Sequence, residues 1–349
     1  MVTFNWLARK TFSNGSRPHF HCRKYSIHSS FMLKIKRLSR SIFRLVMPVV
    51  ILATLACVSA AIWLIHTSAR PQTVSYLVTP AKYGLLSSRG AQVTDETWTN
   101  RDGSTARGWL LRGSIDAPAV IMLHKFDADR SYELNLGVKL NEATNYTILM
   151  PDLRGHGESP SVQFSSFGEF EADDVLAAAD FLRSLKTQDG VTLVGNKIGV
   201  YGVEVGALAA LRAATKDQAI AAVALDSVPT DSDAVVTAAI KRRFPFFSGL
   251  TSSLATAGAR AFYRGSYQNT SACDSAKLVG DRKVLLLSGL DNADLQTSTT
   301  KLTRCFPNNL NVESKNDLSP SGYSIISSSI EKSQEYEQRV IDFFRLSLS

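Results

Sequence analysis

The run Gly202-Val203-Glu204-Val205-Gly206 is the part of this sequence that bears most directly on chemistry. It fits the frame G-x-S-x-G, a sharp strand-to-helix turn that lifts a nucleophilic serine hydroxyl into a cleft. Here the central residue is Glu204. A carboxylate can attack an electrophilic carbon, but the ester that forms needs a base-activated water for its hydrolysis. The chemistry of this turn therefore depends on whether the chain supplies a base.

Histidine is the usual base in such sites, and its positions in this chain are unfavourable. In the G-x-S-x-G arrangement the nucleophile comes first, the acid second and the histidine last. None of the six histidines follows the turn: they are His19, His21, His28, His66, His124 and His156. Two members of a Ser-His-acid triad are therefore replaced or missing.

Apolar runs typical of buried strands alternate with helical patterns along the rest of the chain. We expect a hairpin at 96–112, strands at 119–123, 146–150, 199–203, 220–225, 283–288 and 310–313, and helices at 131–143, 167–185, 295–304 and 331–346. This alternation is typical of a mainly parallel sheet with helices on both faces. Since parallel strands end at the same edge, the segments that follow them should meet there.

Four of these segments resemble motifs of the α/β-hydrolase family. In chain order they are Leu123-His124, similar to the start of the H-G oxyanion loop; the segment 152–159, similar to D-x-R-G-H-G-x-S; the turn at 202–206; and the strand end at 287–291. The closest likeness is to serine aminopeptidase, monoglyceride-lipase and other esterase-like members with a membrane anchor. The resemblance covers residues 92–346 and implies an α/β-hydrolase fold with a lid at about 228–280.

The resemblance also implies a set of site residues. Glu204 and Asp291 occupy the positions equivalent to the triad nucleophile and acid. The backbone amides of Phe126 and Val205 are equivalent to the oxyanion donors, which stabilise developing charge in family enzymes. The family's histidine should fall within 316–329, and that segment contains none. The catalytic set is therefore expected to be inactive.

Lys125 stands where the family has the glycine of its oxyanion loop. Because Lys125 and Glu204 should lie on facing loops, we predict that they form an ion pair that fills the old pocket. The alternative is a solvent-facing Lys125. The resemblance gives His124 and His156, on neighbouring loops, structural roles.

Several polar groups have simpler interpretations. Asp291, without a histidine to orient, could instead cap the helix that follows it. Asp127 and Asp129 lack a third ligand, so we predict no metal site, and no motif indicates a cofactor. The basic cluster at 241–243 is interpreted as a solvated helix end.

The N-terminal region predicts a membrane anchor. The segment 45–65 is uncharged over 21 residues and as a helix would extend roughly 30 Å, the thickness of the hydrocarbon core. We therefore divide the chain into a basic tail (1–44), a transmembrane helix (45–66), a linker (67–91) and an α/β-hydrolase-like domain (92–349). Residues 1–31 are either a targeting extension, which makes the mitochondrial inner membrane an option, or a mis-assigned start.

Charge and cysteine usage indicate the orientation. Residues 1–66 hold ten Lys or Arg and no acid; taking these ten from the 39 basic residues leaves 29 against 31 acidic residues. Five of the ten directly precede the apolar segment, which places the N-terminus in the cytoplasm and the domain outside it. The near-neutral domain is not expected to bind nucleic acid. In an oxidising compartment Cys273 and Cys305 are candidates for a disulfide.

These observations favour a membrane-anchored protein of hydrolase fold that is catalytically inactive and serves binding or scaffolding, with an unidentified small-molecule or protein ligand. The alternative is a hydrolase acting on ester, lipid or peptide bonds with a non-standard catalytic set. A third possibility is acid–base or lyase chemistry by Lys125 and Glu204, which needs pKa values shifted toward neutrality by burial.

Overall fold

The computed structural model describes residues 27–72, 76, 79–80, 92–245, 248–263 and 267–349. The chain divides into two units, Met1–Ala56 and Cys57–Ser349. Helix α1 (Ile27–Ser68) begins in the first unit and ends in the second. Its part Leu38–Ser68 is long and apolar enough to cross a membrane, and it includes the segment 45–66 that the sequence predicts as the span. Most of the expected linker lies outside the described residues.

An eight-stranded sheet forms the centre of the second unit, in the order β1-β2-β4-β3-β5-β6-β7-β8. The hairpin strands β1 and β2 are antiparallel, β2 pairs antiparallel with β4, and all later pairings are parallel. The strands are β1 (Val93–Thr99), β2 (Thr105–Leu111), β3 (Ala117–Leu123), β4 (Thr147–Pro151), β5 (Val194–Val203), β6 (Ile220–Asp226), β7 (Lys283–Gly289) and β8 (Val312–Leu318). The predicted mainly parallel sheet is therefore confirmed.

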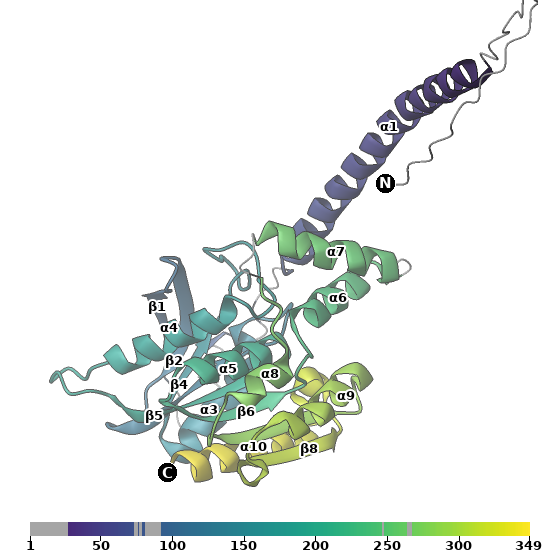
Figure 1. Ribbon diagram of the computed structural model, residues 1–349. Coiled ribbons are helices and arrows are strands. Elements are labelled where there is room, and N and C mark those ends of the chain that lie inside the picture. Colours follow the sequence, from purple (N-terminus) through teal and green to yellow (C-terminus); the bar gives the residue numbers. More distant parts are fainter. Residues whose placement is uncertain (1–26, 73–75, 77–78, 81–91, 246–247, 264–266) are drawn as a thin grey trace, which may run out of the picture. The chain divides into compact units, whose positions relative to one another are not determined.

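Helices cover both faces of the sheet, because its central strands are apolar on both sides. One core contains side chains from α4 (Glu171–Ser184), α5 (Val205–Lys216) and α8 (Ala272–Lys277), and the other contains side chains from α3 (Leu134–Thr144) and α10 (Ile330–Leu348). Figure 1 shows α4, α5 and α8 side by side in front of the strands. Helix α9 (Ala293–Leu302) follows β7.

The predicted lid region contains α6 (Ser232–Arg243) and α7 (Ser248–Phe262), which pack against each other, followed by α8 (Figure 1). The last turns of α1 pack on these helices. The Trp63 ring contacts the Phe244 ring in a tilted arrangement, with centroids 5.5 Å apart. Arg243 donates hydrogen bonds to the carbonyl oxygens of Thr67 and Arg70. The end of α1 is therefore held by α6.

The strand predicted at 310–313 is displaced: β8 runs from Val312 to Leu318. Most side chains of β8 are exposed or half-buried because it is the edge strand. Its polar sequence therefore lacks the apolar signal by which a central strand is recognised. The short helix η5 (Gly322–Ser327) follows β8.

Candidate functional site

The turn at Glu204 has the backbone geometry of a nucleophile elbow. Glu204 lies between β5 and α5 with φ 51° and ψ −111°, a conformation that costs a non-glycine residue about 1–3 kcal/mol. The two glycines of the frame are required by close packing, since an added Cβ would lie 2.5 Å from the backbone of Gly206 at position 202 and 2.6 Å from the Leu123 carbonyl oxygen at position 206. The strained turn is retained although its serine is not.

Both carboxylate oxygens of Glu204 are bound inside the protein. The Phe126 backbone amide donates to Oε2 at 3.1 Å, and Arg242 Nη2 lies 3.3 Å from Oε1. The Glu204 side chain is only 2 % exposed. Phe126 is the residue whose amide the resemblance assigns to the oxyanion site, so the glutamate accepts the hydrogen bond that a reacting oxyanion would need.

Arg242 is a site residue that the sequence interpretation missed. It extends from the last turn of α6, and its guanidinium also lies 3.9 Å from Asp127 Oδ2 and 5.5 Å from the centre of the Phe126 ring. The basic cluster at 241–243 was the available signal, but its interpretation as a wholly solvated helix end is wrong for this residue. The partner of Arg242 is Glu204, which is 38 positions away in the sequence. The two residues meet only when α6 packs over the turn at Glu204.

Lys125 does not form the predicted ion pair with Glu204. Its ammonium donates to the Tyr323 carbonyl oxygen at 2.7 Å and lies 4.3 Å from the centre of the Tyr323 ring and 5.1 Å from that of Tyr132. Aromatic faces and a carbonyl oxygen attract an ammonium without a carboxylate. The solvent-facing alternative holds only in part, because Lys125 is half-buried and lines a surface cavity together with Tyr132 and Tyr323.

Burial shifts the pKa values of both residues toward neutrality. Desolvation raises the pKa of Glu204, opposed by Arg242, the Phe126 amide and Lys125. Desolvation likewise lowers the pKa of Lys125, opposed mainly by the charge of Glu204. These shifts have the direction that acid–base chemistry would need, but each group is already bonded to another part of the protein.

The two histidines near the site hold loops together. His124 Nε2 accepts from the Leu153 amide at 3.0 Å, and Nδ1 donates to the Lys125 carbonyl at 2.8 Å. His156 Nε2 accepts from the Asp127 amide at 3.3 Å, and its Nδ1 is bonded to a backbone carbonyl at 3.0 Å. Burial lowers the pKa of both imidazoles. Each therefore has the structural role that was expected.

Asp291 follows β7 at the position equivalent to the triad acid and accepts a hydrogen bond from Ser321 Oγ at 2.9 Å. It does not cap α9: the N-cap is Asn292, whose side chain accepts from the Leu295 amide. Tyr323 lies in the segment where the family's histidine is expected. The structure therefore places a serine hydroxyl against the acid, and Tyr323 lies two residues further along the chain.

Glu204 and Tyr323 line the same cavity, which has a volume of about 300 Å³. Its other walls come from α6 and from the start of α9 and include Val235, Ala238, Lys241 and Asn292. Val205 is the second oxyanion-equivalent residue. It is the first residue of α5 and directly follows Glu204. The sequence-predicted positions 126, 204 and 205 are therefore brought together.

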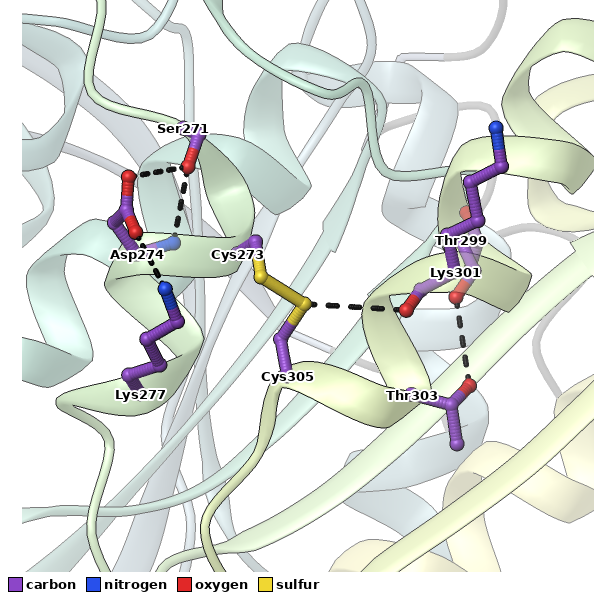
Figure 2. The surroundings of a disulfide bond; sticks show 8 residues. All are labelled: Ser271, Cys273, Asp274, Lys277, Thr299, Lys301, Thr303 and Cys305. Atoms are coloured by element: carbon purple, nitrogen blue, oxygen red, sulfur yellow. Dashed lines mark hydrogen bonds and ion pairs between the residues drawn. A yellow bond between two sulfur atoms is a disulfide. The ribbon is translucent and has the colours of Figure 1, made fainter.

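The remaining predicted features lie apart from this cavity. Asp129 Oδ1 accepts from the Ser131 amide at 2.8 Å and caps the short helix η1 (Arg130–Glu133). No group of three metal-ligating side chains occurs among the residues that the structure describes. Cys273 and Cys305 form a disulfide with an S–S distance of 2.08 Å. Figure 2 shows it joining α8 to the short turn that follows α9.

Comparison with known proteins identifies the family. Residues 120–300 match the model of the alpha/beta hydrolase family, which is more than half of the chain. The chain therefore belongs to the α/β-hydrolase family.

Individual relatives are distant. The chain is 28% identical to thiohydrolase aneE of Aspergillus aculeatus over 120 residues, which are 34% of this chain and 36% of that protein. It is 28% identical to polyketide transferase ATR5 of Stachybotrys chlorohalonatus over 138 residues, 39% of this chain and 45% of that protein. The matches thus span less than half of either curated relative.

Solved structures show the same fold. The esterase Pf2001 of Pyrococcus furiosus superimposes with a TM-score of 0.59 at 21% identity, covering 80% of this chain and all of that one. The acylaminoacyl peptidase of Pyrococcus horikoshii superimposes with a TM-score of 0.55 at 15% identity, over 74% of this chain and 42% of that one. At these identities the likeness establishes the fold, and function has to be argued from the site.

Proposed function

We propose that this chain is a membrane-anchored member of the α/β-hydrolase family that has lost catalysis and acts by binding. The observation that carries the proposal is the hydrogen bond from the Phe126 amide to the Glu204 carboxylate. An oxyanion hole accelerates acyl transfer because its donors are free to meet charge that develops in the transition state. A donor already bound to a fixed carboxylate cannot give this differential stabilisation.

Attack by Glu204 itself is also disfavoured. Arg242 and the Phe126 amide hold its oxygens, which lowers the nucleophilicity of the carboxylate. Hydrolysis of an acyl intermediate would need a base, and both ring nitrogens of His124 and of His156 are bonded to the backbone. The alternative function, hydrolysis of ester, lipid or peptide bonds with a non-standard set, would require Arg242 to leave the glutamate.

The relatives indicate a class of ligand for the binding role. The proteins that this chain resembles are named a thiohydrolase, a polyketide transferase and an esterase. An ester joins an acyl group to an alcohol. We therefore propose that the cavity beside Glu204 and Tyr323 receives an acyl compound without cleaving it. The span Leu38–Ser68 and the basic residues before it support an anchor with its N-terminus in the cytoplasm and the domain on the other side.

Hydrolysis of chromogenic acetyl, butyryl and octanoyl esters by the purified full-length chain tests this proposal, with Glu204→Ala as the matched variant. We expect no turnover above the buffer rate from either protein. Turnover by the unmodified chain that disappears in Glu204→Ala would overturn the proposal and make the carboxylate the nucleophile. Turnover that survives in Glu204→Ala would also contradict it, by locating a catalytic group elsewhere.

A further inference from the structure

A second cavity lies on the α3–α10 side of the sheet and shares no lining residue with the Glu204 cavity. Its volume is about 320 Å³, at the lower end of the range for small-molecule sites. Its polar lining includes residues of η1, α3, β5 and α10, among them Tyr132, Glu133, Lys139, Tyr201, Tyr336 and Glu337. The cavity thus combines aromatic rings with ionisable groups.

Glu133 is the polar group of this cavity whose bonding is incomplete. Its side chain is buried, with 2 % of the residue exposed. Within the part of the chain that the structure describes, no donor lies within hydrogen-bonding distance of Glu133 Oε1. A buried carboxylate oxygen without a donor is destabilising. Burial of Glu133 therefore lowers the stability of the fold, and a bound hydrogen-bond donor would offset this loss.

The other carboxylate of the cavity is already neutralised. Glu337 accepts hydrogen bonds from the Asn135 side-chain amide and from Lys139 Nζ, the latter at 2.5 Å. Asp226 does not line the cavity but accepts hydrogen bonds from the Gly322 amide and from the hydroxyl of Tyr336, which does. Among the described residues that line the cavity, Lys139 is thus committed to Glu337, and the charge of Glu133 is unmatched.

The tyrosines add a second attraction for positive charge. The Tyr132 hydroxyl donates to the carbonyl of Gly322 at 2.7 Å, and the Tyr201 and Tyr336 hydroxyls are bonded to each other at 2.8 Å. With their hydroxyls engaged, these side chains offer a ligand chiefly their rings. Aromatic rings bind ammonium groups through their negative faces. Leu136 and Ile330 supply apolar wall.

We propose that this cavity binds a small organic ammonium ion, with its N–H groups on Glu133, its charge beside the tyrosine rings and its alkyl part against Leu136 and Ile330. Burial and the charge of Asp226 raise the pKa of Glu133, while Lys125 opposes the shift. The ammonium therefore competes with a proton for the carboxylate. The inference does not depend on the proposed function, because the two cavities are separate.

Binding of n-butylammonium to the full-length chain, compared with n-butanol of equal chain length, tests the role of charge. We expect the ammonium to bind at least tenfold more tightly by titration calorimetry. Glu133→Gln keeps the shape of the side chain and removes its charge, so it should abolish this difference. Glu335→Gln, which removes an exposed carboxylate from the same helix as Glu337, should leave it unchanged.

A second variant keeps the test decisive if Glu133→Gln does not fold. Ser333→Phe narrows the cavity from α10 without changing Glu133, and a folded variant should lose n-butylammonium binding at least tenfold. The proposal is overturned if alkylammonium ions of two to six carbons do not bind the folded chain, which would mean a cavity that is only hydrated. Equal affinity for n-butanol, or binding unaffected by both variants, overturns it as well.

Discussion

At the scale of single residues, the Glu204 carboxylate is bound by groups of the site itself, the Phe126 amide and Arg242. The turn still holds its central side chain in a strained backbone conformation, and the Phe126 amide still faces that side chain. Glu204 is longer than the serine of the G-x-S-x-G frame, and its carboxylate reaches the Phe126 amide that faces the turn. The buried charge then needs a cation, and Arg242 provides it.

The dependence of Glu204 on Arg242 predicts a stability effect. Arg242→Met should lower the free energy of unfolding by roughly 2 kcal/mol, because it leaves a buried carboxylate without its cation. The expected loss of unfolding free energy is smaller than for a fully buried ion pair, because the Arg242 side chain is 33 % exposed. Urea unfolding of the full-length chain measures it.

The double variant Arg242→Met/Glu204→Gln is the critical control, since it removes the unpaired charge and should recover most of the loss. Lys241→Met, on the exposed neighbour, should change stability little. If Arg242→Met is as stable as the unmodified chain, the ion pair does not neutralise the buried carboxylate as described.

At the scale of elements, Asp226 links three parts of the fold at the end of β6. It accepts from the Gly322 amide of η5 at 2.9 Å and from the Tyr336 hydroxyl of α10 at 2.8 Å. An added Cβ at position 322 would lie 2.4 Å from the Tyr336 hydroxyl, so the packing around this carboxylate is tight. Burial raises the pKa of Asp226 to about 6.

This raised pKa predicts the direction of a pH effect. The folded chain holds the Asp226 proton more firmly than the unfolded chain, so the group stabilises the fold below about pH 4, and this contribution is lost as the pH rises to about 6. Relative to Asp226→Asn, the unmodified chain should lose about 3 kcal/mol over that interval. Urea unfolding at pH 3.5, 5 and 7.5 gives the difference directly. A difference that does not change with pH would contradict the prediction.

The sequence predicts the elements of this fold better than the contacts between them. Central strands such as β3 and β6 are apolar on both faces, and that pattern is visible in the chain. The edge strand β8 is mostly polar and was misplaced. Lys125 and Glu204 were correctly assigned to facing loops, but sequence spacing cannot reveal that Tyr323 attracts the lysine or that α6 brings Arg242 to the glutamate.

At the scale of the whole molecule, the disulfide and the apolar helix bear on one question, the compartment of the domain. Cys273 and Cys305 are bonded, which is typical of oxidising compartments. The positive charges before the span favour our proposal that the domain lies on the side opposite the cytoplasm. The disulfide and the charges before the span are both consistent with a domain on the extracytoplasmic side of the membrane.

Thiol labelling of the full-length chain in isolated membranes checks this topology. We expect reduction to add two maleimide–polyethylene glycol adducts per chain, because the chain has four cysteines and two are bonded. The double variant Cys273→Ser/Cys305→Ser should gain none on reduction. If both sites label before reduction, the domain lies in a reducing compartment and the proposed orientation is wrong.

The adjacent arginines at the end of α6 have a mechanical consequence. Arg242 forms an ion pair with the Glu204 carboxylate, and Arg243 donates hydrogen bonds to the carbonyl oxygens of Thr67 and Arg70. A load on the last turn of α1 therefore reaches α6 through Arg243, the residue next to the one whose guanidinium bonds Glu204. The same load reaches the segment 163–165 through Ala69 and Arg70. Tension on the last turn of α1 would therefore act on the Arg242 end of α6 and on the segment 163–165 together.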